Sequence, residues 1–142
     1  MKYVLSYTNP NNHFIDFSLT INGSSLDQIT VQLPAWRPGR YELGNFAKNI
    51  KDFEVKDING YSVSFNKLTK DKWCIQSNFR DFIITYRYYA AELNAGSTYL
   101  DENQLYVNPV NCFLFLPDFP ETEIEIILDV PKSYQVYSAI AK

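Results

Sequence analysis

The sequence predicts an all-β protein, a two-sheet antiparallel β-sandwich of about ten strands with at most one short helix. Three observations lead to this prediction. Apolar and polar residues alternate through most of the chain, which is the period of a half-buried strand. Aromatic residues make up 16% of the 142 residues, and their flat side chains suit a pleated surface. Turn-forming Asn-Gly pairs separate several of the alternating runs.

Four runs show the strand alternation most clearly. Polar residues occupy most of the positions between their apolar residues, so each run is expected to bury one face. The apolar positions are Ile15, Phe17, Leu19 and Ile21 in the first run, Ile29, Val31 and Leu33 in the second, Phe82, Ile84, Tyr86 and Tyr88 in the third, and Ile124, Ile126, Leu128 and Val130 in the fourth.

The connections between strands are also predicted from local sequence. Asn59-Gly60 lies between two alternating runs and predicts a two-residue hairpin turn. A second hairpin is predicted through residues 70–72. A helix of two or three turns is predicted over residues 41–51, where helical spacing places four apolar residues on one face: Leu43, Phe46, Ala47 and Ile50.

Composition argues against two classes of partner. The net charge is −3, whereas nucleic-acid binding needs a clustered excess of Lys and Arg. No apolar run approaches the roughly 20 residues of a membrane span. Residues 1–7 do not contain the apolar segment of a secretory signal. We therefore expect a cytoplasmic protein with neither nucleic acid nor membrane among its partners.

The chain is expected to form a single domain over residues 1–142. A chain of this length buries roughly 68% of its unfolded surface, which is enough for one core. Residues 133–139 alternate like one more strand, and the sequence stops three residues later. Because a domain seldom ends within such a pattern, we expect a chain cut at a domain boundary of a larger protein.

The sequence offers little catalytic machinery. It contains one histidine, His13, and two cysteines, Cys74 and Cys112. A zinc peptidase needs the motif H-E-x-x-H, which one histidine cannot supply, and the three residues cannot complete a tetrahedral zinc site. Both cysteines are expected to be buried free thiols. We therefore predict no catalytic residue, metal or cofactor in this chain.

One loop, residues 33–41, has the composition of a recognition element. Trp36 and Tyr41 bracket two arginines, Arg37 and Arg40, while two prolines and Gly39 restrict the backbone. In one interpretation the loop is a rigid connection and Trp36 is buried in the core. In the other, an arginine binds a carboxylate or an aromatic face.

The same loop carries a family resemblance. Pro34-Ala35-Trp36-Arg37-Pro38-Gly39-Arg40-Tyr41, followed by Asn45-Phe46-Ala47-Lys48-Asn49-Ile50, resembles the signature P-x-W-x-P-G-S-Y…R-D-F-A-[RK]-x-[IV]. This signature belongs to the N-terminal domain of the glycyl aminopeptidase family of zinc metallopeptidases. The resemblance continues through residues 84–93 and 107–114. Arg40 stands where Ser is usual, and Asn108-Pro109-Val110-Asn111 stands where Asn-Gly-Thr-Ser is usual.

The resemblance implies a β-sandwich that precedes a thermolysin-like catalytic domain, and the zinc ion is expected in that domain. The partners would be the catalytic domain of the same polypeptide and a peptide substrate. The chain would be an accessory domain that shapes substrate access. An alternative is a free-standing module that binds carbohydrate or peptide on an exposed Tyr and Trp platform. A structural adhesion repeat is a third alternative, and the absence of internal repeats weighs against it.

The resemblance also suggests where the domain meets the substrate. Asn108 and Asn111 flank Pro109, which marks a strand boundary, and an amide offers both donors and an acceptor. One of these amides would reach the cleft, near Tyr99 and Asp101. The alternative is that both Asn residues cap turns.

Overall fold

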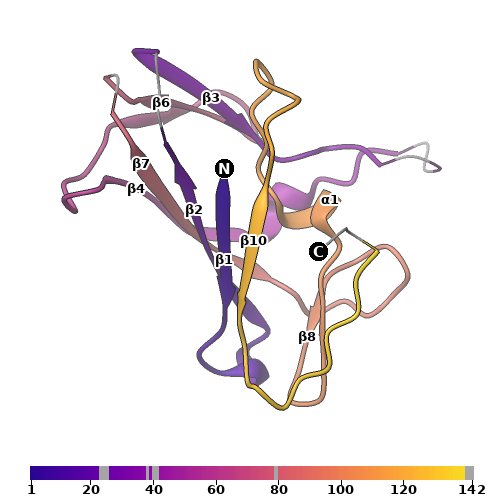
Figure 1. The fold of residues 1–142 in the computed structure, drawn as a ribbon. Helices are drawn as coiled ribbons and strands as arrows, with labels where there is room; N and C mark the ends of the chain where they lie inside the picture. Colours follow the sequence, from indigo (N-terminus) through magenta and orange to yellow (C-terminus); the bar gives the residue numbers. More distant parts are fainter. Residues whose placement is uncertain (23–25, 38, 40–41, 79, 140–142) are drawn as a thin grey trace.

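A computed structural model describes residues 1–22, 26–37, 39, 42–78 and 80–139 (Figure 1). Its short helices are the 3₁₀-helices η1 (Pro10–Asn12) and η2 (Phe46–Asn49) and the α-helix α1 (Pro109–Cys112). Its strands are β1 (Lys2–Ser6), β2 (Phe14–Ile21), β3 (Gln28–Gln32), β4 (Ile50–Asp57), β5 (Phe65–Lys67), β6 (Lys72–Gln76), β7 (Phe82–Tyr89), β8 (Tyr99–Leu100), β9 (Leu105–Tyr106) and β10 (Glu125–Asp129).

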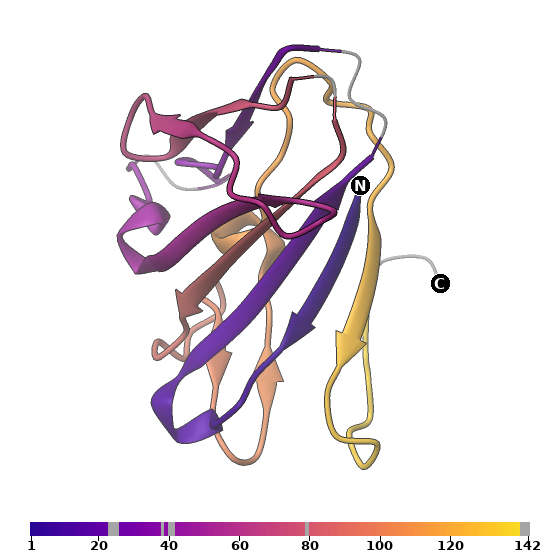
Figure 2. The same cartoon turned by 90° about the vertical axis from the view of Figure 1, so that its left-hand side faces the viewer.

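The strands form two main sheets, which confirms the all-β, sandwich-like prediction. The larger sheet has the order β10-β1-β2-β7-β4, and Figure 2 shows its long strands side by side. The smaller sheet has the order β3-β6-β5, and a two-stranded sheet joins β8 to β9. Pairing is antiparallel throughout these sheets except between β1 and β10, which run parallel.

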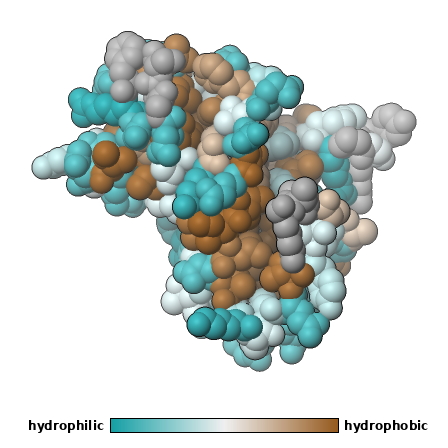
Figure 3. Space-filling model, in the orientation of Figure 1, coloured by the Kyte–Doolittle hydropathy of each residue, from teal (hydrophilic) through white to brown (hydrophobic). Residues whose placement is uncertain are grey.

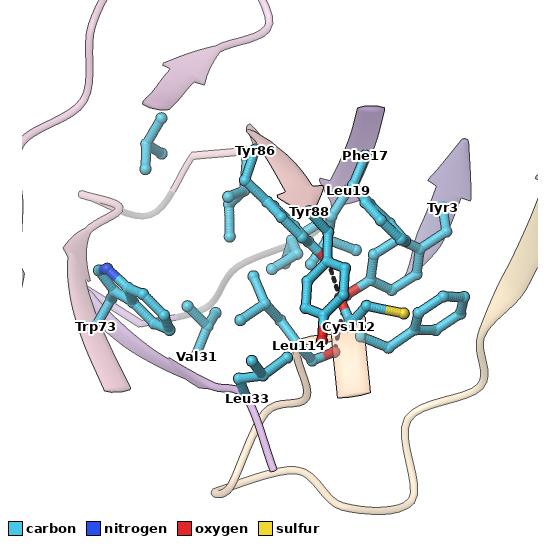
Figure 4. Packing of buried hydrophobic residues seen from close by; sticks show 14 of the residues in the cluster. Tyr3, Phe17, Leu19, Val31, Leu33, Trp73, Tyr86, Tyr88, Cys112 and Leu114 are labelled. Carbon is cyan, nitrogen blue, oxygen red and sulfur yellow. Dashed lines mark hydrogen bonds between the residues drawn. The ribbon is translucent and has the colours of Figure 1, made fainter. Parts of the chain in front are cut away.

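The core lies between the inner faces of the two main sheets, and the predicted alternation supplies most of it. Phe17 of β2 stacks on Tyr86 of β7, with ring centroids 4.9 Å apart (Figure 4). Trp73 of β6 is 2% exposed and stacks on Phe53 at 4.7 Å, which joins the smaller sheet to the larger one. The aromatic content that predicted strands therefore fills the space between the sheets.

The prediction that Trp36 is buried is wrong. Its side chain is 48% exposed, on the loop that follows β3. The tryptophan in the core is Trp73 instead. The alternation of β6 turns Trp73 inward, whereas the loop places no such constraint on Trp36.

Two local predictions need correction. The predicted helix over residues 41–51 is reduced to the single turn η2, because Ile50 already pairs with Tyr88 as the first residue of β4. The predicted two-residue turn at Asn59-Gly60 is a three-residue loop, since the backbone N–H of Asp57 donates to the carbonyl of Tyr61 at 2.8 Å. Gly60 has φ 86°, the positive value that such a loop requires.

The C-terminal part also differs from the prediction. Residues 133–139 form no strand, and β10 is the edge strand of the larger sheet in the described residues. In β10, Ile126 packs against the core, but Ile124 and Leu128 of the same predicted row are exposed. The predicted inward row is therefore only partly buried, because β10 is an edge strand of the larger sheet.

Candidate functional site

A pocket of about 410 Å³ lies where four segments meet. Its walls come from the segment that leads into η2, from the end of β7, from the loop over residues 94–98, and from α1. Three of the residues predicted from the sequence, Arg37, Asn108 and Asn111, are brought together at its edge.

These three side chains share one acceptor, the backbone carbonyl of Gly96. The guanidinium of Arg37 donates to this oxygen. The amide of Asn111 donates to it at 2.8 Å, and the amide of Asn108 donates at 3.3 Å. The carbonyl thus joins the loop after β3 to α1, two segments that lie far apart in the sequence.

The loop that presents this carbonyl is held by its own side chains. Asn94 Oδ1 accepts from the backbone N–H of Gly96 at 2.9 Å, which is an Asx-turn. Ser97 Oγ accepts from the backbone N–H of Asn94 at 3.0 Å and donates to the carbonyl of Glu92. These bonds hold the loop in a conformation that presents the Gly96 carbonyl.

Asn108 acts as a helix cap. Its Oδ1 accepts from the backbone N–H of Val110 at 3.3 Å, and Pro109 occupies the first helical turn, where its missing N–H is harmless. With its amide nitrogen on Gly96, both polar groups of Asn108 are bonded to backbone. This geometry supports the turn-capping alternative for Asn108.

Asn111 differs from Asn108 in a decisive way. Its side chain is 1% exposed and forms part of the pocket wall, and its Oδ1 has no hydrogen-bond partner. A buried acceptor without a donor costs about 1–3 kcal/mol. A donor brought by a ligand or a partner would remove that cost. The sequence could not distinguish the two asparagines, because the difference depends on a loop fifteen residues away.

Two buried tyrosines hold the segment that follows α1. The hydroxyl of Tyr86 donates to the carbonyl of Cys112 at 2.6 Å, and that of Tyr3 donates to the carbonyl of Leu114 at 2.9 Å (Figure 4). Burial raises the pKa of both tyrosines, so both hydroxyls stay protonated and able to donate. The larger sheet thereby fixes the position of Asn111, which precedes Cys112.

The opposite wall of the pocket contains Tyr88. Its hydroxyl accepts from the amide of Asn49 at 3.1 Å. Burial, with a smaller contribution from the negative charge of Glu92, raises the pKa of Tyr88 to about 12. Glu92 lines the same pocket. Sequence reasoning missed Tyr88 as a site residue because its position in an alternating strand marked it as core.

The other predicted residues lie apart from this pocket or outside the described residues. The hydroxyl of Tyr99 donates to Asp101 at 3.1 Å, and the backbone N–H of Asn103 contributes most to lowering the pKa of Asp101. This pair shapes the turn between β8 and β9. Trp36 is exposed on the loop beside Arg37, and Arg40 and Tyr41 fall outside the residues that the structure describes.

The metal-ligand types are dispersed. His13 Nδ1 lies 2.6 Å from the carbonyl of Leu100, and Cys112 is buried, which raises the pKa of its thiol to about 12. Cys74 lies on β6 in the smaller sheet. Within the described ranges, no three His, Cys, Asp or Glu side chains are grouped as a metal site would require. No helix in these ranges is long and apolar enough to span a membrane.

Comparisons with known proteins identify similar sequences and structures. The profile of the peptidase M61 N-terminal domain matches residues 2–142. The fold is similar to the crystal structure of an aminopeptidase N family protein from Idiomarina loihiensis, with a TM-score of 0.81 and 27% sequence identity. The match covers 92% of this chain and 22% of that chain. No curated protein matches the sequence.

Proposed function

Because this chain belongs to the family of peptidase M61 N-terminal domains, we propose that it is a non-catalytic accessory domain of a larger zinc aminopeptidase. In this proposal the chain packs on the catalytic domain of the same polypeptide and shapes the path of the peptide substrate. The zinc ion belongs to the catalytic domain, since His13, Cys74 and Cys112 lie on separate segments and do not fit a zinc site.

The relative lengths of the proteins support this proposal. The chain spans 22% of the length of the Idiomarina loihiensis aminopeptidase N family protein. In that protein most of the chain therefore lies outside the part that resembles this domain. A catalytic domain in the same polypeptide accounts for the peptidase family name and for the dispersed metal-ligand types described above.

An apolar surface suitable for docking supports it as well. Apolar side chains gather in the middle of the face shown in Figure 3, in the region where Figure 1 draws β10 and β1. Ile124, Ile127 and Leu128, in β10 or next to it, are exposed. Contiguous exposed apolar side chains mark protein–protein contacts more often than isolated ones do. A domain that docks on a catalytic domain needs such a face.

The observation that carries the substrate role is the unpaired Oδ1 of Asn111 in the pocket wall. A peptide brings backbone N–H groups and an amino terminus, both of which donate hydrogen bonds. An amide oxygen accepts from either without adding charge. Tyr86 and Tyr3 hold the backbone beside Asn111, so the acceptor is positioned before a substrate arrives.

The test uses the full-length peptidase with Asn111→Leu, which removes the acceptor and keeps a similar volume. We expect kcat/KM on peptide substrates to fall by roughly tenfold, which corresponds to about 1.4 kcal/mol. Thr85→Ala, on the outer face of β7, is the matched control and should leave kcat/KM unchanged. An unchanged kcat/KM in Asn111→Leu, with the fold retained, would exclude the substrate role.

One observation favours the binding-module alternative, the exposure of Trp36. A half-exposed tryptophan on a restricted loop can stack on a sugar ring or on an aromatic side chain. A titration with short β-linked glucose oligomers decides between the two functions. It uses the Trp73→Phe variant, in which the measured fluorescence comes from Trp36. A saturable change that Trp36→Ala abolishes would favour the binding module.

A further inference from the structure

The pocket contains charges of both signs in addition to its unpaired acceptor. Arg37 and Lys48 line it as cations, and Glu42 and Glu92 line it as anions. Their formal charges cancel, so the pocket does not select a ligand by net charge. A ligand that carries both a positive and a negative group would use this arrangement fully.

Arg37 and Glu92 reach the pocket from different segments of the chain. Glu92 follows β7 and lines the pocket together with Tyr88 of that strand. Arg37 belongs to the loop that follows β3. Its guanidinium donates to the carbonyl of Gly96 in the loop over residues 94–98. Asn111 shares that carbonyl, so its amide is a close neighbour of the guanidinium.

We propose that this pocket binds a small zwitterion, that is, a free α-amino acid or a short peptide with both ends free. The ammonium group is placed against Glu92 and Asn111 Oδ1, and the carboxylate is placed against the guanidinium of Arg37. Guanidinium groups bind carboxylates in a bidentate manner, and an ammonium group brings three donors to an acceptor that has none. A volume of about 410 Å³ accommodates a ligand of this size.

Binding requires a local shift, and Arg37 is the part that can make it. Asn111 Oδ1 is closed off from solvent. The guanidinium of Arg37, which shares the Gly96 carbonyl with the amide nitrogen of Asn111, is the end of a flexible side chain. A ligand carboxylate competes with the Gly96 carbonyl for that guanidinium and draws it outward. This movement opens the path by which the ammonium group reaches Oδ1.

This site rests on the same Asn111 acceptor as the proposed substrate role, but its binding can be measured in the isolated chain, without the catalytic domain. The test is therefore an NMR titration of the ¹⁵N-labelled 142-residue chain with L-alanine and with L-alanyl-L-alanine. We expect at least one probe to give saturable shifts of the Asn111 side-chain amide and the Gly96 backbone amide. L-alaninamide lacks the carboxylate and N-acetyl-L-alanine lacks the ammonium group, so each should bind at least tenfold more weakly than L-alanine.

Variants assign the effect to the pocket. Arg37→Gln and Glu92→Gln should each weaken binding at least tenfold, and both are accessible enough to leave the fold intact. Glu54→Gln, an exposed carboxylate on β4, is the matched control and should bind as the wild-type chain does. Absence of saturable shifts, equal binding of the single-charge analogues, or unchanged binding in both pocket variants would overturn the proposal. The kinetic test of Asn111→Leu in the full-length peptidase is a separate measurement, so a failure of zwitterion binding is distinguishable from a failure of the accessory role.

Discussion

The guanidinium of Arg37 occupies the space that a side chain at position 96 would fill, directly against Gly96. A β-carbon built on Gly96 would overlap the guanidinium atoms of Arg37. This contact lets the loop after β3 reach the carbonyl that also binds Asn108 and Asn111. Arg37 can therefore occupy this place only because residue 96 has no side chain.

Gly96→Ala should displace Arg37 without unfolding the protein. The overlap involves the far end of a flexible side chain, so we expect a loss below about 1 kcal/mol in the free energy of unfolding. Denaturant melts measure this loss, and the Arg37 side-chain NMR resonances report the displacement. Gly60→Ala is the contrasting variant, because Gly60 has open space but φ 86°, so the cost should be about 1–2 kcal/mol. Unshifted Arg37 resonances in Gly96→Ala would contradict the contact.

The two tryptophans should differ strongly in their contribution to stability. Trp73→Ala empties a core position that is 2% exposed, and such changes cost about 3–5 kcal/mol. Trp36 is 48% exposed, so Trp36→Ala should cost less than about 1.5 kcal/mol. Urea melts of the two variants measure both values. Equal losses would show that Trp36 is buried after all.

The tryptophans also illustrate what the sequence could predict. Trp73 lies within an alternating run whose inward positions follow from periodicity, and the same reasoning identified the core rows of β2, β3 and β7. Trp36 lies in a loop, where no period assigns a face. Residues 133–139 alternate as a strand does, but a strand also needs a partner, and local sequence does not specify one.

The candidate site shows the same limit. Arg37, Asn108 and Asn111 were selected from the sequence for their chemistry, and the fold brings all three to Gly96. No local pattern predicts that they share one carbonyl. The contact depends on how the loop after β3, the loop over residues 94–98 and α1 pack together. The cap at Asn108 was predictable, since Asn before Pro is a common start of a helix. The unpaired acceptor on Asn111 was not.

Stability should fall as pH rises above about 10, the pKa of an ordinary tyrosine. The folded state keeps Tyr86 and Tyr3 protonated because burial raises their pKa, while the unfolded chain releases these protons. The unfolded state then binds fewer protons, so the free energy of unfolding decreases with pH. The stability is fully present below the unfolded pKa and is lost above it.

Tyr86→Phe should reduce this decrease, because phenylalanine has no proton to release. Denaturation midpoints measured from about pH 8 to about pH 11 give the slope, to which each buried tyrosine contributes up to about 1.4 kcal/mol per pH unit. Tyr61→Phe is the control, since Tyr61 is exposed and its replacement should leave the slope unchanged. A slope that is identical in wild type and Tyr86→Phe would show that Tyr86 is not held protonated.

The two asparagines that look alike in the sequence should respond differently to substitution. Asn108→Ala removes a helix cap and should cost about 1 kcal/mol. Asn111→Leu removes a hydrogen bond to Gly96, but it also removes a buried acceptor that has no donor. The two effects oppose each other, so the net change in the free energy of unfolding should lie within about 1 kcal/mol of zero.

Asn111→Asp makes the comparison sharper. The carboxylate cannot donate to the Gly96 carbonyl, and it places a charge at a position that is 1% exposed, so it should be much more destabilising than leucine. Thermal melts at neutral pH compare the stabilities of Asn108→Ala, Asn111→Leu and Asn111→Asp. We expect Asn111→Leu to be the most stable of the three and Asn111→Asp the least stable. A loss well above about 2 kcal/mol in Asn111→Leu would mean that Oδ1 is already paired in the isolated chain. In that event the acceptor would be unavailable to a substrate or to a zwitterion, and both proposals for the pocket would lose their basis.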